Sequence, residues 1–97
     1  MVWTSGIWTV KPGREDEFAA AWTEFAAWSL GEFPGSRAWL LRRRDEPHVF
    51  MSIGPWPSDE VVDTWRGSAG FRERIGRIRE MLDGFEPRTF DEVAAIV

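Results

Sequence analysis

The 97-residue sequence contains no cysteine, tyrosine, asparagine or glutamine, and it has only one histidine and one lysine. Without cysteine the chain can form no disulfide, no thiolate nucleophile and no thiolate metal site. A single histidine without a companion ligand at metal spacing also argues against a zinc or iron site. The groups that remain for chemistry are carboxylates, arginines, hydroxyls, indole N–H groups and His48.

Several sequence motifs are also missing. There is no Gly-x-Ser-x-Gly elbow for a serine nucleophile, no phosphate-binding glycine loop and no dinucleotide fingerprint. No apolar run approaches the roughly 20 residues of a membrane span, and the N-terminus does not resemble a signal peptide, so we expect a cytoplasmic protein. A formal net charge of −4 provides no basic field for nucleic acid or an anionic membrane.

Large aromatic residues are abundant, with seven Trp and seven Phe. The length predicts a single domain over residues 1–97, and a chain of this size buries somewhat over ~60% of its unfolded surface. Each large aromatic side chain can bury about 150–250 Å². Because one small core cannot hide all of them, the surplus indicates a subunit interface, a ligand cavity or both.

The hydrophobic pattern predicts strands and helices in the order βαββαβ, which is the ferredoxin-like arrangement of an α+β fold with an antiparallel sheet. The third strand should end at Gly54-Pro55, because proline cannot continue a ladder of hydrogen bonds. The predicted strands cover residues 2–10, 36–43, 48–53 and 86–94, and the first helix covers residues 14–30.

Residues 52–71 predict a turn followed by two successive helix starts. Ser58 is a plausible N-cap for the first, and a glycine-rich break at residues 67–70 separates it from the second. Gly84 is the expected C-cap. Trp65 should face back towards the sheet with its indole N–H available as a donor. The second helix carries one apolar stripe, formed by Phe71, Ile75, Ile78 and Leu82.

The predicted strands carry large apolar side chains on both faces. Trp8 and Val10 alternate with Ile7 on the first strand, and Phe50 alternates with Met51 on the third. A sheet that helices cover on one side only should be polar on the other side. The second face therefore requires a cover, and we expect a second copy of the chain to supply it, with residues 93–97 extending onto that copy.

The sequence resembles the antibiotic biosynthesis monooxygenase (ABM) domain family. The resemblance lies in the Gly-Pro-Trp turn at residues 54–56, in the helix that bears Trp65, and in the Ser-x-x-Phe helix start at residues 68–71. Further matches cover nearly the whole chain and occur in the expected order, at residues 10–18, 33–36 and 85–90.

This resemblance implies a dimeric α+β barrel, in which two sheets pack face to face as a homodimer. It also implies cofactor-independent oxygenation of a small polycyclic phenol, quinol or anthrone-like aromatic. Trp65 would orient the substrate ring, Arg88 would stabilise the phenolate, and His48 or a bound water would accept the proton. By the same resemblance, the apolar walls of the cavity would be supplied by Trp22, Phe25, Phe71 and Ile75.

Each of these residues also has a purely structural interpretation. Trp65 and the four wall residues could be ordinary core side chains. Arg88 could pair with Glu86 or Asp91, and His48 could be an exposed residue of the hairpin that the predicted strands 36–43 and 48–53 form.

The function has alternatives too. Members of the family often place Asn or Tyr beside the Trp, and their absence favours a non-catalytic dimeric module that binds an aromatic metabolite. Ile75 stands where the heme-degrading branch of the superfamily has an iron-binding histidine, which argues against heme degradation. A third possibility is a cavity filled by the protein's own Trp side chains, with a purely structural role.

Overall fold

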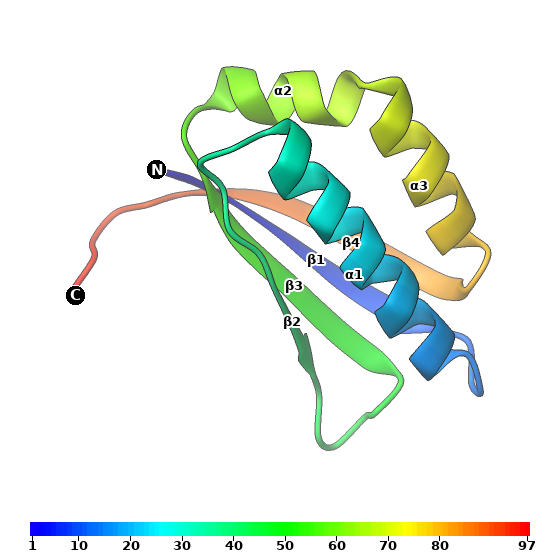
Figure 1. The fold of residues 1–97 in the computed structure, drawn as a ribbon. Helices are drawn as coiled ribbons and strands as arrows, with labels where there is room; N and C mark the ends of the chain where they lie inside the picture. The colour runs from blue at the N-terminus through cyan, green and yellow to red at the C-terminus, as the bar shows by residue number, and fades with distance from the viewer.

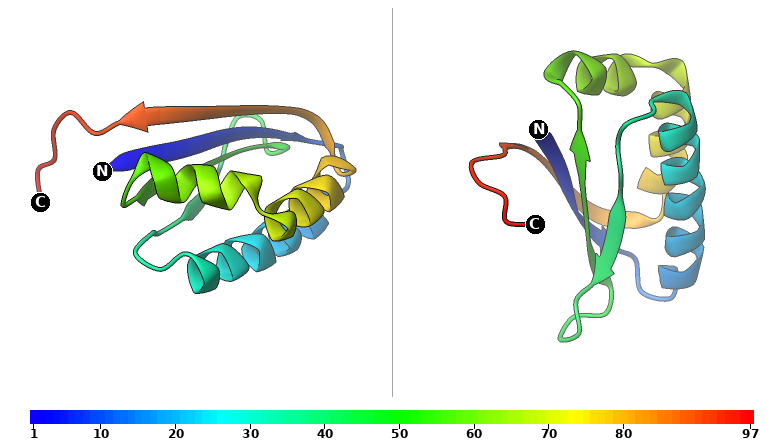
Figure 2. Two further views of the ribbon diagram at one scale, coloured as in Figure 1. Left: turned by 90° about the horizontal axis from the view of Figure 1, so that it is seen from above. Right: turned by 60° about the vertical axis from the view of Figure 1, so that its left-hand side comes forward.

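Four antiparallel strands form a sheet in the order β2-β3-β1-β4, and three helices lie on one of its faces (Figures 1 and 2). The computed structural model describes residues 1–97. The α+β, ferredoxin-like prediction is confirmed. The elements are β1 Val2–Val10, α1 Glu15–Glu32, β2 Trp39–Arg42, β3 Val49–Trp56, α2 Asp59–Gly67, α3 Ala69–Arg79 and β4 Leu82–Asp91.

The predicted end of the third strand at Gly54-Pro55 is wrong, because β3 continues to Trp56. The ladder between β2 and β3 ends at the pair Trp39 and Ile53. Beyond it, the carbonyl of Pro55 accepts a hydrogen bond of 3.4 Å from the Arg37 N–H, so the main-chain polar groups of Pro55 face the β2 side. Because the β2 ladder has already ended there, the missing N–H of Pro55 removes no hydrogen bond between strands.

The boundary between the last helix and the last strand also differs from the prediction. Helix α3 ends at Arg79, and β4 already begins at Leu82, so Gly84 lies in a strand and is not a C-cap. The carbonyl of Glu80 accepts hydrogen bonds from Arg14 Nη1 at 2.9 Å and from Lys11 Nζ at 3.2 Å. Cationic groups stabilise the negative end of a helix dipole, so these contacts favour a helix end here.

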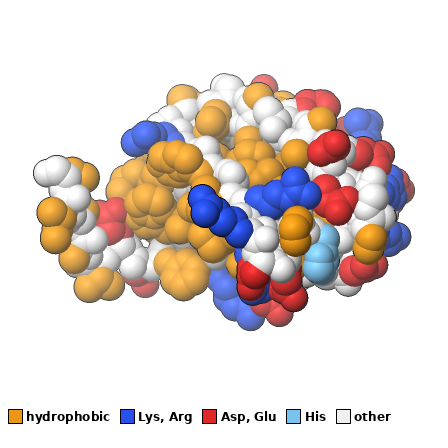
Figure 3. All heavy atoms as spheres, turned by 90° about the horizontal axis from the view of Figure 1, so that it is seen from below, with side chains coloured by type: hydrophobic (Ala, Val, Ile, Leu, Met, Phe, Trp, Pro, Cys, Tyr) orange, Lys and Arg blue, Asp and Glu red, His pale blue; other side chains and the backbone are white.

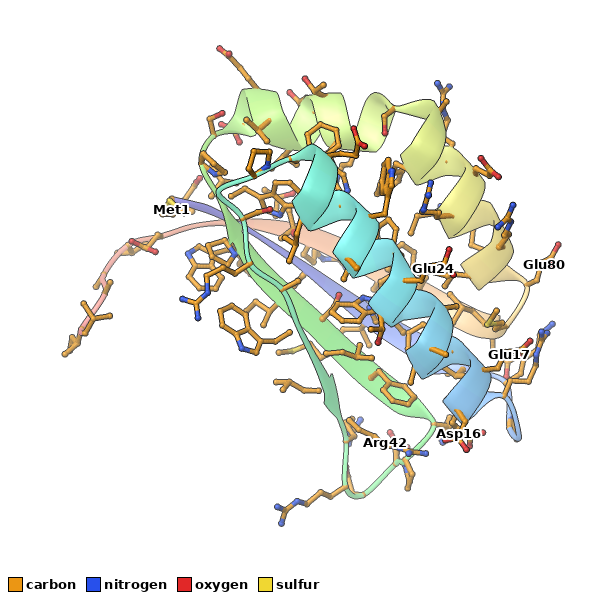
Figure 4. The ribbon with its side chains drawn as sticks, in the orientation of Figure 1. Met1, Asp16, Glu17, Glu24, Arg42 and Glu80 are labelled. Atoms are coloured by element: carbon orange, nitrogen blue, oxygen red, sulfur yellow. The ribbon has the colours of Figure 1, made fainter.

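The Arg14 side chain contacts both the start of α1, at Glu17, and the end of α3, at the Glu80 carbonyl. Figure 4 shows Glu17, near the start of α1, and Glu80, just after α3, at the same end of the molecule. Arg14 Nε lies 2.7 Å from Glu17 Oε1, and this hydrogen bond lowers the pKa of the Glu17 carboxyl.

The two helix starts predicted around residues 58 and 68 are confirmed. The Ser58 hydroxyl accepts from the Val61 N–H at 3.3 Å, and the Ser68 hydroxyl accepts from the Phe71 N–H at 3.2 Å. Ser68 also donates its hydroxyl proton to the Trp65 carbonyl at 2.8 Å, so it ends α2 and begins α3. These caps fix the bounds of the helix that carries Trp65.

The hydrophobic core lies between the sheet and the helices. Phe18 of α1 is fully buried and packs with ring centroids 5.5 Å from Trp8 and 5.0 Å from Phe50. Trp8 also stacks on Phe85 of β4 at 4.1 Å. Even-numbered residues of β1 and β3 thus face the helices, which places odd-numbered residues on the opposite face.

No helix covers that opposite face (Figure 2). Trp39, Leu41 and Phe90 expose 39%, 51% and 53% of their surfaces on it. Figure 3 shows apolar side chains gathered between the C-terminal tail and the body of the molecule. None of the helices combines the length and the apolar composition that crossing a membrane requires.

Candidate active site

A cavity of about 510 Å³ lies between the helices and the helix-facing side of the sheet. Its volume is in the range of small-molecule sites in proteins, roughly 300–1,000 Å³. An open cavity argues against the alternative in which the protein's own Trp side chains fill this space. Its wall includes seven large aromatic residues, which are Trp8, Trp22, Phe25, Trp56, Trp65, Phe71 and Phe85.

Most of the predicted site residues meet at this cavity. The wall includes Trp22, Phe25, Trp65, Phe71, Ile75 and Arg88. His48 is not part of it. This residue precedes β3 at the hairpin end of the sheet, where its carbonyl accepts from the Val10 N–H at 2.8 Å.

Trp65 is at the centre of an aromatic cluster. It is 8% exposed, and its ring centroid lies 4.4 Å from Trp56, 4.8 Å from Phe71 and 5.8 Å from Phe25. Its indole N–H donates to Ser29 Oγ at 2.9 Å. The prediction that this N–H is available to a ligand is therefore wrong, and Trp65 can contact a ligand only through its ring.

Ser29 is a cavity residue that the sequence analysis missed. It is 3% exposed, accepts from Trp65 and donates its own proton to the Phe25 carbonyl at 2.8 Å. Its position could have revealed it, because Ser29 continues the helical spacing of Phe18, Trp22 and Phe25 on the buried face of α1. A serine on an apolar stripe needs a hydrogen-bond partner.

We expect Ser29→Ala to lower the free energy of unfolding by about 1–3 kcal/mol, because it leaves the buried Trp65 N–H without an acceptor. Thr23→Ala is the matched control, since Thr23 makes the same type of bond to the carbonyl four residues earlier, but on the exposed face of α1. Urea unfolding of both variants, repeated in a Trp65→Phe background, measures the coupling. Equal costs of Ser29→Ala in both backgrounds would contradict the pairing.

Two more indole groups of the cavity wall bond to hydroxyls. Trp8 Nε1 donates to Ser52 Oγ at 2.9 Å, and Trp56 Nε1 donates to Thr4 Oγ1 at 2.9 Å. All four residues belong to the wall. Like Ser29, the two hydroxyl residues were missed, because their partners are 44 and 52 positions away in the sequence.

The charged residues of the wall all have one sign. They are Arg37, Arg66, Arg79 and Arg88, and no Asp, Glu or Lys accompanies them. None of the four forms an ion pair, since the ion pairs of the protein involve Arg14, Arg43 and Arg77 only. The wall therefore carries no negative side chain, although the chain has a formal net charge of −4. Not every guanidinium faces the cavity, because that of Arg37 lies 4.7 Å from the ring centroid of Trp39 on the uncovered face.

The arginines differ in how they are held. Arg66 is half-buried and donates from Nη1 to Thr89 Oγ1 at 3.1 Å. Arg88 is exposed, and strand register pairs it with Ser5 on the face away from the helices. Its Nη1 donates to the Pro87 carbonyl at 2.8 Å, and it makes no ion pair with Glu86 or Asp91. Arg88 therefore reaches the wall only at the edge of the sheet.

The wall has no carboxyl, imidazole or amine side chain, so it offers no ordinary general base. The carboxyls with a shifted pKa lie elsewhere. Arg14 lowers the pKa of Glu17, and Arg43 lowers the pKa of Asp45, in both cases chiefly by a side-chain hydrogen bond. Nowhere in the structure do three His, Asp or Glu side chains form a group that could hold a metal ion.

Comparison with solved structures finds the same fold in oxygenases. SnoaB, a cofactor-independent oxygenase from Streptomyces nogalater, matches with a TM-score of 0.85 and 25% identity, over 98% of this chain and 95% of that one. A mutant of SnoaB matches with a TM-score of 0.88 and 24% identity over the same shares. A conserved protein from Methanosarcina mazei Go1 matches with a TM-score of 0.82 and 19% identity, over 92% and 89%.

A search of curated proteins finds no match. The family model described as antibiotic biosynthesis monooxygenase matches residues 1–76, which include β1, α1, β2, β3, α2 with Trp65, and most of α3. The chain therefore belongs to the antibiotic biosynthesis monooxygenase family.

Proposed function

We propose that this protein is a cofactor-independent monooxygenase that acts on a small polycyclic phenol, quinol or anthrone-like aromatic. The observation that carries the proposal is the combination of an aromatic-lined cavity with four arginines and no carboxylate in its wall. Such a site favours a flat apolar ligand that becomes negatively charged. Family membership and the likeness to SnoaB support an oxygenase activity.

The proposed reaction needs an anionic substrate and dioxygen. Deprotonation of an anthrone gives an electron-rich anion that reduces dioxygen, and a carbon–oxygen bond forms at the former methylene carbon. Loss of water from the resulting hydroperoxide leaves a carbonyl, so the substrate and one O₂ yield a quinone and one H₂O. The substrate loses four electrons and dioxygen gains four.

The protein would supply binding, orientation and charge stabilisation. Trp65 would orient the substrate through its ring, and Trp22, Phe25, Phe71 and Ile75 would keep the cavity apolar. Arg66 is the best-placed guanidinium to stabilise the anion, because it is half-buried and held by Thr89. Arg88 would assist from the β4 edge.

The proton acceptor would be water, although the sequence also offered His48. His48 lies outside the cavity wall, and the wall itself contains no group that can act as a base at neutral pH.

Oxygen uptake tests the proposal. Chelator-treated protein should consume dioxygen with anthrones or dihydronaphthoquinones faster than the protein-free solution, and Trp65→Phe should reduce the excess rate. Trp39→Phe is the control, because Trp39 is 39% exposed and lies outside the cavity wall. Uptake no faster than autoxidation for the whole panel would contradict the proposal.

The second candidate function is a non-catalytic module that binds an aromatic metabolite. The absence of any titratable base in the wall favours it. Compounds that quench Trp fluorescence but are not oxidised above the protein-free rate would support this function over the first.

We also propose that the protein is a homodimer. The uncovered face of the sheet carries the exposed side chains of Trp39, Leu41 and Phe90, beside the half-buried side chains of Trp3, Ile7 and Met51. Exposed apolar surface of this extent typically marks an interaction site. Sedimentation equilibrium should give a dimer, and Leu41→Glu should weaken it. A monodisperse monomer at micromolar concentration would contradict the proposal.

A further inference from the structure

We propose that Thr4 and Ser52 form a pair of hydroxyl donors in the floor of the cavity, and that they bind two oxygens on one edge of an aromatic ligand whose negative charge is shared between them. This inference rests on the proposed function, because it takes the ligand to be an aromatic oxyanion. In this proposal each hydroxyl accepts a hydrogen bond from an indole N–H and donates its own proton to the anion. The arginines of the wall add to the stabilisation of the anion.

Strand register places the two hydroxyls together. Thr4 pairs with Gly54, and Gly6 pairs with Ser52, so Thr4 and Ser52 are diagonal neighbours on adjacent strands. Both lie on the helix-facing side, as their bonds to the buried Trp56 and Trp8 require. Diagonal neighbours are roughly 7–8 Å apart, a separation that oxygens on one edge of a single ring system can span.

The hydrogen-bond pattern leaves both hydroxyl protons free. Thr4 Oγ1 and Ser52 Oγ each accept an indole N–H at 2.9 Å, and neither donates to any group of the protein. Ser29 differs, because it accepts from Trp65 but uses its own proton on the Phe25 carbonyl. A hydroxyl that already accepts a hydrogen bond is polarised and becomes a better donor.

Two glycines border the hydroxyl pair on the helix-facing side of the sheet. A Cβ atom at Gly6 would lie 2.9 Å from Trp8 Nε1 and 3.1 Å from Ser52 Oγ, so any side chain there would disturb this indole–hydroxyl pair. At Gly54 a Cβ atom would collide with the Arg37 carbonyl, whose backbone passes over this position. The two glycines therefore make room for the Trp8 indole and the Phe85 ring over Gly6 and for the Arg37 main chain over Gly54, and these groups border the two hydroxyls.

The surrounding charge favours an anionic acceptor. The wall contains four arginines and no carboxylate, so no protein anion competes for the two hydroxyl protons. Hydrogen bonds to a charged oxygen are stronger than those to a neutral one. The pair should therefore bind the phenolate form of a ligand more tightly than the phenol form, which lowers the pKa of the bound ligand.

A hydroxyanthraquinone provides the test, because it has no oxidisable methylene group and its phenolate absorbs at longer wavelength than its phenol. Spectrophotometric titration of the complex gives the pKa of the bound phenol. Thr4→Val and Ser52→Ala should each weaken binding of the phenolate by about tenfold or more, while binding of the phenol changes much less. Each variant should raise the bound pKa accordingly.

Two matched variants control for altered folding. Thr9→Val removes a hydroxyl from the same strand but from the opposite face, and it should leave the bound pKa unchanged. Thr4→Ser keeps the hydroxyl and should retain the wild-type value. If the ligand binds and Thr4→Val and Ser52→Ala leave its pKa unchanged, the donor pair is wrong while the proposed function stands. If the wild-type protein binds no hydroxyanthraquinone, both proposals fail.

Discussion

Trp65→Ala should lower the free energy of unfolding by about 3–5 kcal/mol, the range for removing a buried large aromatic side chain. Trp65 joins α2 to the sheet through Trp56 and to α1 and α3 through Phe25 and Phe71. Its loss would enlarge the cavity and leave three rings without their common neighbour. Because small domains have a total stability of about 5–15 kcal/mol, the variant should be close to unfolding.

Urea unfolding of Trp65→Ala beside Trp39→Ala measures this effect. Trp39 is 39% exposed on the uncovered face, so its loss should cost the isolated chain far less. Because we propose that this face is the dimer interface, both alanine variants are compared in the Leu41→Glu background, which weakens the dimer. Trp65→Phe should be intermediate, because it keeps a ring in the cluster but loses the bond to Ser29. Equal costs for the two alanine variants would show that the cluster around Trp65 does not hold the helices to the sheet. This is also why activity tests require Trp65→Phe.

The pH dependence of activity should follow the substrate. Because the only charged groups of the wall are arginines, the ionisation that limits the rate must be that of the substrate. We expect kcat/KM to rise about tenfold per pH unit below the pKa of the substrate and to level off above it, with no descending limb from a protein acid. Across a series of substrates, the midpoint of the kcat/KM profile should shift by the same amount as the pKa of the substrate.

Steady-state oxygen uptake from pH 5 upwards measures this profile, and His48→Ala provides the decisive comparison. If water accepts the proton, His48→Ala should have the wild-type profile. A midpoint that stays constant across substrates and disappears in His48→Ala would show that the imidazole is the base, and that the cavity rearranges to reach it.

The features that were predicted correctly from the sequence depend on neighbouring residues. The caps at Ser58 and Ser68 are local, because each hydroxyl bonds to an N–H only three residues ahead. The alternation along β1 and the apolar spacing on α3 are local too. The spacing placed Phe71 and Ile75 on one face of α3, whereas their place in a cavity wall was implied by the family resemblance.

The features that were missed depend on pairs of residues far apart in the sequence. The end of β3 depends on its pairing with β1, which continues to the pair of Val2 and Trp56 beyond the start of β2, and so Pro55 alone could not predict it. The indole N–H of Trp65 donates to the hydroxyl of Ser29, which lies 36 positions earlier on another helix. Arg66 looks like a surface residue of α2 until Thr89 of β4 is placed beside it.

Turnover with isotopically labelled dioxygen is the most direct test of the central claim, which is that this cavity performs monooxygenation with no cofactor. Chelator-treated protein, an anthrone and labelled dioxygen should give a quinone with one labelled oxygen atom at the new carbonyl and the second labelled atom in water. The yield should exceed that of the protein-free solution and should fall in Trp65→Phe. Labelled product that forms only after a metal or flavin is added would contradict the claim.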